Sequence, residues 1–159
     1  MVEKNKVKVR LRLLIVKDNK ILLTHTFKGD NLLFGDYYFY IGGKLEFGET
    51  IESGCKREIK EECGENTEFK MEKVLYIRDF IPKENPEEHS VELFILGTIN
   101  KFEELDNVPE KDHPDQKRME WKKIECLPRN LYPQELTPIL IADFKEGFRR
   151  QGVYVGRLK

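Results

Sequence analysis

The chain has 159 residues and a mass of 18.9 kDa, a size that favours a single domain spanning 1–159. Hydrophobic residues make up 39% of it, which excludes a disordered chain, and no stretch approaches the roughly 18 apolar residues of a membrane helix. The 28 basic and 29 acidic residues nearly cancel, so the sequence lacks the basic face typical of a nucleic-acid-binding protein.

The cysteines and the N-terminus indicate the compartment. The three cysteines, Cys55, Cys63 and Cys126, form no CxxC pair, which disfavours both a disulfide framework and a cysteine-built zinc site. The first 16 residues alternate charged and apolar side chains without a small-residue cleavage site, so a secretory signal is not expected there. We therefore expect a cytoplasmic protein that makes no membrane contact.

Three strands are predicted before the glycine pair at positions 42–43. Apolar and basic residues alternate over 8–16, the pattern of a half-buried strand. Residues 17–20 supply a turn, and 21–26 are expected to form the partner strand. Residues 37–41, which are rich in tyrosine and phenylalanine, predict a short third strand that leads into the glycines.

The clearest helix begins after Thr50, a suitable N-cap, and ends before Gly64, a residue type favoured where helices stop. Two more strands are expected over 74–80 and 91–99. The charged, proline-containing stretch 101–118 reads as a loop, because it shows neither the helical nor the strand period.

The last part of the chain predicts a strand over 119–124 and a helix after Pro133. Apolar residues at helical spacing mark this helix: Leu136, Ile139, Leu140, Phe144 and Phe148. The predicted order is therefore β-β-β-α-β-β-β-α, an α/β mixture without the strict alternation of a doubly wound sheet.

Three carboxylates stand on one face of the middle helix. Glu58, Glu61 and Glu62 are at positions i, i+3 and i+4, so their charges repel unless a cation lies between them. Oxygen ligands of this kind suit Mg²⁺ or Mn²⁺ better than zinc. The glycines at 42–43 let backbone approach a ligand closely, although a plain turn and water-facing glutamates would account for each feature separately.

The spacing of these residues matches a long pattern. Gly43 is followed by five residues and Glu49, then by seven residues and the run REIKEECG from Arg57 to Gly64. This resembles the Nudix box of the Nudix hydrolase family. Eight specified positions at fixed spacing make the resemblance much more specific than a short glycine motif.

Two positions depart from the pattern. Glu65 stands where the family usually has an apolar residue, and Ile41 stands where a proline commonly precedes the glycines. Neither change removes a ligand. The resemblance implies an α/β/α sandwich around a mixed sheet, and it extends to a late strand in which Trp121 precedes a short turn into Leu-Pro.

The resemblance implies a hydrolase that cleaves a phosphoanhydride bond with the help of Mg²⁺ or Mn²⁺. Carried over position by position, Glu58, Glu61 and Glu62 hold the metal, together with the carbonyl oxygen of Gly43. The metal neutralises phosphate charge and lowers the pKa of the attacking water.

The resemblance also implies supporting and catalytic roles. Arg57 and Glu49 form an ion pair that fixes the loop against the helix. The family often takes its general base from a loop before the late strand, where Asp115 is our first choice. The other candidates are three loop carboxylates and one glutamate of the helix, namely Glu110, Asp112, Glu120 and Glu61.

The expected substrate is a small nucleotide: a nucleoside triphosphate, ADP-ribose or a nucleotide sugar. Two other functions stay open. An RNA 5′-end pyrophosphohydrolase would use the basic face of residues 8–12, although the net charge of −1 disfavours nucleic acid. A non-catalytic nucleotide-binding module is the other, but such modules typically lose the carboxylates that this chain keeps.

A homodimer is also an expectation, because Nudix folds often pair and the aromatic run 37–40 offers a large apolar surface. In the alternative arrangement two of these rings enter the core and two line the substrate pocket. Cys55 is expected to pack inside, since it shares the apolar stripe of its helix with Ile51 and Ile59.

Overall fold

The computed structural model describes residues 6–27, 35–110, 114 and 116–158. Its strands are β1 (Val7–Lys17), β2 (Lys20–Thr26), β3 (Tyr37–Tyr40), β4 (Phe69–Phe80), β5 (His89–Ile99), β6 (Val108–Pro109), β7 (Lys117–Lys123) and β8 (Val153–Gly156). Its helices are α1 (Ile51–Cys63) and α2 (Leu136–Lys145), with short 3₁₀ turns η1 (Glu103–Leu105) and η2 (Ile124–Cys126).

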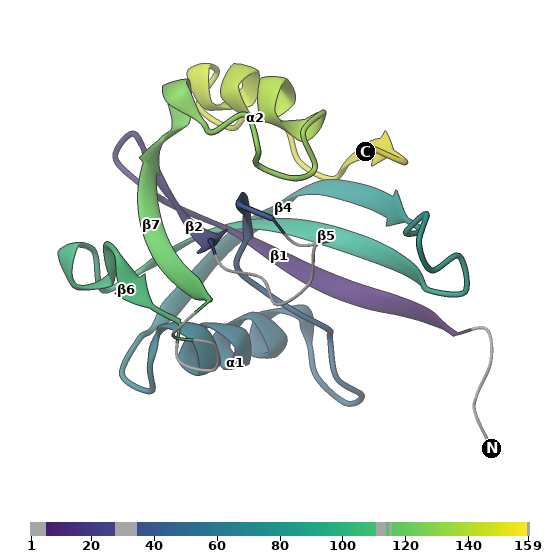
Figure 1. The fold of residues 1–159 in the computed structure, drawn as a ribbon, viewed down its shortest axis with the longest axis horizontal. Helices are drawn as coiled ribbons and strands as arrows, with labels where there is room; N and C mark the ends of the chain where they lie inside the picture. Colours follow the sequence, from purple (N-terminus) through teal and green to yellow (C-terminus); the bar gives the residue numbers. More distant parts are fainter. Residues whose placement is uncertain (1–5, 28–34, 111–113, 115, 159) are drawn as a thin grey trace.

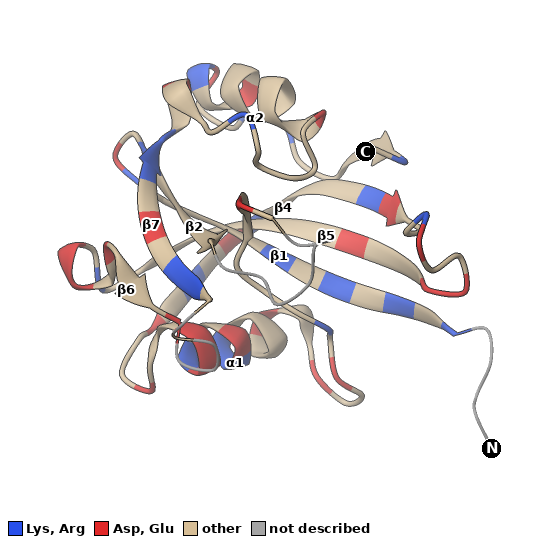
Figure 2. Cartoon of the chain, in the orientation of Figure 1, with Lys and Arg blue, Asp and Glu red and all other residues tan. Residues whose placement is uncertain are grey.

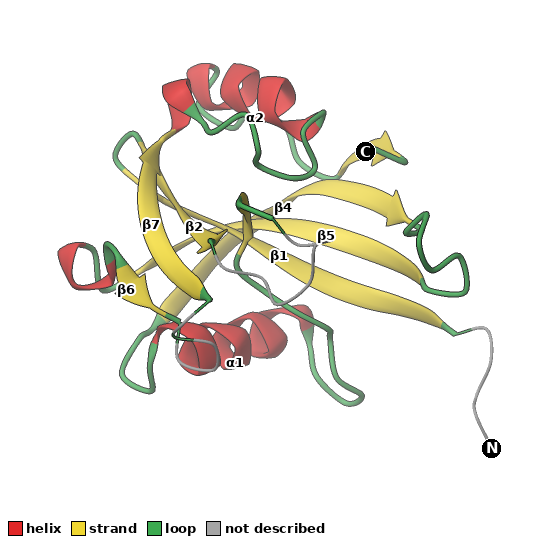
Figure 3. Cartoon of the chain, in the orientation of Figure 1, coloured by secondary structure: helices red, strands yellow, loops and turns green. Residues whose placement is uncertain are grey.

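The strands form one mixed sheet in the order β6-β7-β2-β1-β5-β4-β8, with β3 paired to β2. The central strand β1 runs antiparallel to β2 and parallel to β5, and β8 runs parallel to β4. Helices α1 and α2 lie on opposite sides of the strands (Figures 1 and 3). The predicted α/β/α sandwich around a mixed sheet is therefore confirmed.

Two apolar cores, one on each face of the sheet, hold the layers together. Leu13 and Ile15 pack with Ile59 of α1, whereas Leu14 packs with Leu140 of α2. All three consecutive residues of β1 are fully buried. The prediction of a half-buried strand is thus correct only for the first half of β1, because both helices cover its second half.

The expected loop over 101–118 contains short structure that the sequence did not reveal. It includes the turn η1 and the two residues of β6, and β7 already begins at Lys117. Pairing of Val108 with Met119 defines β6. A two-residue strand has no period to detect, so only its partner strand reveals it.

The C-terminal helix is shorter than predicted. It ends at Lys145, and Phe148 follows it with a φ of 53°, although its ring still packs in the core below α2. The chain then returns as β8 beside β4, a strand missing from the predicted order. In the described part of the chain, no helix has the length and apolar character needed to cross a membrane.

The aromatic run on β3 divides between the interior and the surface. Tyr38 and Tyr40 are buried in the core under α2, whereas Tyr37 and Phe39 are half-buried on the other face. The apolar surface that residues 37–40 offer to a second copy of the chain is therefore only about half of what the sequence suggested. Dimerisation stays a prediction.

The three cysteines are expected to differ sharply in reactivity toward a thiol reagent. Cys55 and Cys63 are buried, and burial raises the pKa of each thiol to about 12, whereas Cys126 is exposed. Because the thiolate is the reacting form, one thiol of the native protein should react rapidly with Ellman's reagent and all three after denaturation. Rapid labelling of Cys55 in the native protein would contradict the packing described here.

Candidate functional site

The glycine pair runs alongside the central strand β1. Leu11 donates its N–H to the carbonyl oxygen of Gly43 at 2.7 Å, and Leu13 donates to Ile41 at 2.7 Å. Between them Gly42 has a φ of 142°, and a Cβ placed on it would lie 2.0 Å from the carbonyl oxygen of Leu11. Only glycine fits at this position, since both the backbone angle and the space exclude a side chain.

Helix α1 presents the carboxylates to this segment. It begins with a reciprocal capping box, in which Thr50 and Ser53 each accept a hydrogen bond from the other's backbone N–H. At its other end Gly64 has a φ of 106°. Both ends match the sequence prediction.

Glu58 is buried against the glycine pair, with 7% of its surface exposed. A Cβ placed on Gly43 would lie 2.6 Å from Oε1 of Glu58, so the absence of a side chain there makes room for the carboxylate. Burial raises the pKa of Glu58, and the hydrogen bond from Arg57 partly offsets this effect. The protein therefore maintains a carboxylate where its charged form is costly.

Glu62 lies one helical turn further along and reaches Gly42. Its Oε2 accepts a hydrogen bond from the N–H of Gly42 at 3.2 Å. Burial raises the pKa of Glu62 to about 8, and repulsion from Glu58 and Glu110 adds to the shift. Two other carboxylates thus lie close enough to Glu62 to raise its pKa further, which marks this region as a candidate functional site.

Arg57 donates hydrogen bonds to four residues of the loop and the helix. It donates to both carboxylate oxygens of Glu49, at 2.5 and 3.0 Å, and to the carbonyl oxygen of Lys44 at 2.9 Å. Its Nη1 also donates to Glu58 at 2.9 Å and to Glu61 at 3.2 Å. This arrangement lowers the pKa of Glu49 to about 2 and ties the loop that precedes α1 to the helix.

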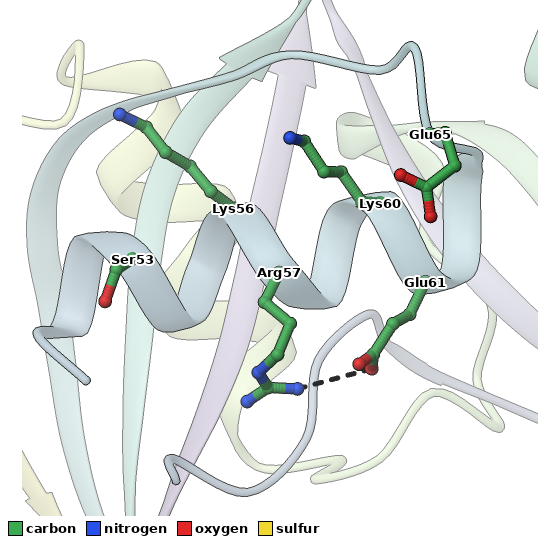
Figure 4. Close-up of a pocket in the computed structure, with 6 residues that line it drawn as sticks. All are labelled: Ser53, Lys56, Arg57, Lys60, Glu61 and Glu65. Atoms are coloured by element: carbon green, nitrogen blue, oxygen red, sulfur yellow. Dashed lines mark hydrogen bonds and ion pairs between the residues drawn. The ribbon is translucent and has the colours of Figure 1, made fainter. Parts of the chain in front are cut away.

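Glu61 lies on the outer side of the helix. About half of its side chain is exposed, and it points toward Arg57, which donates a hydrogen bond to it (Figure 4). Together with Arg57, Ser53 and three further residues it lines a surface hollow of about 390 Å³. The expected trio is therefore divided, with Glu58 and Glu62 inward and Glu61 outward.

The donor chemistry fits a divalent cation, although the ligands do not converge. Within residues 6–27, 35–110, 114 and 116–158, no three carboxylate, imidazole or thiol side chains are arranged to hold a metal ion. The carboxylates of buried Glu58 and partly buried Glu62 nevertheless both have a raised pKa, and hard oxygen donors are what Mg²⁺ and Mn²⁺ prefer. The carbonyl of Gly43 already accepts one hydrogen bond and keeps a second lone pair.

The general-base candidates fall in different places. Asp115 and Asp112 lie outside the described residues. Glu110 is buried, with 6% exposed, and lies close enough to Glu62 for its charge to raise the pKa of that residue. Glu120 points to the other face of β7, where its Oε2 lies 2.6 Å from Nδ1 of His25. Glu120 is therefore not placed to act as a general base beside Glu62.

Trp121 belongs to the core and not to the site. Only 8% of it is exposed, and its indole N–H donates to the carbonyl oxygen of Phe102 at 2.7 Å. The rings of Tyr37 and Phe39 are the aromatic surfaces of β3 that stay partly open. They are available for stacking on a base, a contact that every nucleobase accepts.

Sequence reasoning missed an ion-paired row on the sheet. Glu92 on β5 is 1% exposed and bonds to Arg12 on β1 and to Arg78 on β4. The signal was a lone glutamate inside the apolar strand predicted over 91–99. Such a residue needs a buried partner.

Comparison with known proteins gives a consistent result. The family model described as NUDIX domain matches residues 7–139. An ADP-ribose pyrophosphatase of Methanocaldococcus jannaschii is 33% identical over 126 residues, covering 69% of this chain and 71% of the relative.

Solved structures agree in fold. A NUDIX hydrolase from Nitrosomonas europaea superposes with a TM-score of 0.69 at 14% identity, covering 99% of this chain and 82% of that one. An ADP-ribose pyrophosphatase from Streptococcus suis gives 0.60 at 20% identity, covering 97% of this chain and 100% of that one. At these identities the likeness concerns the fold alone.

Proposed function

The chain belongs to the Nudix hydrolase family, and from that premise we propose that it hydrolyses the phosphoanhydride bond of a small nucleoside diphosphate derivative. ADP-ribose is the substrate to test first, because the relative from Methanocaldococcus jannaschii carries the name ADP-ribose pyrophosphatase. A nucleotide sugar and a nucleoside triphosphate are the other members of the proposed class.

The observation that carries the proposal is the pair of inward carboxylates over the glycine segment. Glu58 packs on Gly43 and accepts a hydrogen bond from Arg57, and Glu62 accepts one from the N–H of Gly42, so both carboxylates are held against the glycine segment. Two carboxylates with raised pKa values, one buried and one partly buried, are costly to keep in a module that only binds nucleotides. Fixed anions of this kind are what a cation-assisted hydrolase requires.

Nudix hydrolases generally need divalent metal ions, and we propose Mg²⁺ or Mn²⁺ for this chain. The proposed ligands are the carboxylates of Glu58, Glu61 and Glu62 and the carbonyl oxygen of Gly43. Such an ion, when bound, neutralises phosphate charge and lowers the pKa of the attacking water. Arg57 keeps Glu58 and Glu61 in place and, through Glu49, holds the loop that carries Gly43.

We still propose Asp115 as the general base, and we compare the effect of replacing it with the effect of replacing Glu110. Replacing Asp115 by Asn should lower kcat on the order of a hundredfold with little change in KM, because a base acts mainly in the transition state. The matched variant Glu110→Gln tests the described loop carboxylate beside Glu62. If Asp115→Asn turns over like the parent, the role passes to Glu110 or Glu61, whichever loses kcat on substitution.

A substrate panel with product identification tests the function itself. ADP-ribose should yield AMP and ribose 5-phosphate, a nucleotide sugar two monophosphates, and a nucleoside triphosphate a monophosphate and pyrophosphate. Triphosphorylated RNA serves as the fourth substrate. Cleavage of RNA alone would replace our proposal with an RNA 5′-end pyrophosphohydrolase, and binding of nucleotides without any cleavage would indicate a non-catalytic module.

A further inference from the structure

Charged residues interrupt the neighbouring strands β1, β5 and β4, coloured blue and red in Figure 2, and three of them form an ion-paired row across the sheet. At its centre Glu92 accepts hydrogen bonds through Oε1 from Nε and Nη2 of Arg12, at 3.3 and 3.1 Å. Its Oε2 accepts from Nη1 of Arg78 at 2.7 Å. One buried carboxylate therefore serves two guanidinium groups on the neighbouring strands.

The two arginines differ in how many of their hydrogen-bond donors are already used. Arg78 is 6% exposed and donates its Nε and Nη2 to the carbonyl oxygen of Leu158, so all three of its nitrogens are occupied. Arg12 keeps about a fifth of its side chain exposed, and its Nη1 makes no hydrogen bond with the described residues. Arg12 thus has both open surface and a spare donor.

The backbone places Arg12 beside the glycine segment. Because Leu11 and Leu13 pair with Gly43 and Ile41, Arg12 lies level with Gly42. Gly42 also binds the carboxylate of Glu62 through its N–H.

We infer that Arg12 binds a phosphate group of the substrate, held in position for this by Glu92 and Arg78. The inference rests on the proposed function and adds a residue for recognition of the diphosphate. A guanidinium can donate two parallel hydrogen bonds to phosphate oxygens, and its partly buried position strengthens each of them. The fixed side chain loses little freedom on binding, since Glu92 already orients it.

The decisive variants are Arg12→Met and Arg12→Lys, with Arg10→Met as the matched control. Arg10 stands two residues earlier on the same strand and pairs with Glu88, further from Gly42. We expect Arg12→Met to raise KM for ADP-ribose roughly 10- to 100-fold with a smaller effect on kcat, and Arg12→Lys to restore part of the loss. Arg10→Met should change KM less than threefold.

Binding is measured separately by calorimetry with the α,β-methylene analogue of ADP-ribose, which cannot be hydrolysed at the bridging position. The affinity should fall by the same 10- to 100-fold in Arg12→Met, with melting curves showing that the variant is folded. Equal affinities in Arg12→Met and Arg10→Met would overturn the inference. If the parent protein binds the analogue through Arg12 but cleaves nothing in the panel, the proposed function fails while the role of Arg12 stands.

Discussion

Replacing Glu62 by glutamine is expected to lower kcat on the order of a hundredfold or more while leaving the fold intact. Glutamine has nearly the same shape but no negative charge, so it cannot serve as a carboxylate ligand. It keeps an acceptor for the N–H of Gly42, which Glu62 now binds. The measurement is steady-state hydrolysis of the substrate that the panel identifies.

The melting temperature of Glu62→Gln, measured in EDTA at pH 7, should be no lower than that of the parent. Burial raises the pKa of Glu62 to about 8, so the charged form is disfavoured in the folded state. The neutral glutamine does not carry this cost. Loss of activity with an unchanged or higher melting temperature would therefore place the effect on chemistry and not on stability.

The control for this prediction is Glu65→Gln, which removes an exposed carboxylate just after the same helix. It should turn over like the parent. EDTA should abolish the activity of the parent, and added Mg²⁺ or Mn²⁺ should restore it. Parent-like turnover by Glu62→Gln, or full activity in EDTA, would overturn the proposed role of the carboxylates.

Replacing Glu92 by glutamine is expected to destabilise the protein by about 3 kcal/mol, because it leaves two guanidinium groups facing each other without the buried counter-charge. The glutamate side chain is 2% exposed, so water cannot take over its role. For a chain of this size the loss corresponds to a fall in Tm of roughly 6 to 12 °C. Urea unfolding followed by circular dichroism measures the free energy directly.

Glu87→Gln removes a carboxylate of the exposed turn just before β5 and serves as the control. Its free energy of unfolding should stay within about 0.5 kcal/mol of the parent value. If Glu92→Gln unfolds at the same urea concentration as Glu87→Gln, the row of charges contributes nothing to stability. Its description as a buried network would then be wrong.

The sequence predicted best where local signals are strong. Helix α1 was expected between Thr50 and Gly64 and is observed at Ile51–Cys63, because the cap at its start and the glycine at its end act within a few residues. The strands from β1 to β5 were also predicted, with bounds shifted by up to five residues at the start of β4. Alternating apolar residues indicate where these strands lie, and turn-forming residues indicate where they end.

The parts that escaped prediction depend on contacts between distant residues. β8 is four residues long and exists through its pairing with β4, some 75 positions earlier in the chain. The burial of Glu110 and the sharing of Glu92 between two strands likewise follow from tertiary packing. The helical spacing placed three glutamates on one face, but only packing separates inward Glu58 and Glu62 from outward Glu61.

The bond from Arg78 to Leu158 is made to a main-chain oxygen, which every amino acid has. The hydrogen bond therefore survives a change of side chain at position 158, where the packing of Leu158 against the core under α2 asks only for an apolar residue. The number of residues between β8 and position 158 is what matters, because inserting or deleting one would carry the carbonyl away from the guanidinium. Along this stretch, the expected evolutionary pattern is exchange among apolar residues at position 158 with strict conservation of length.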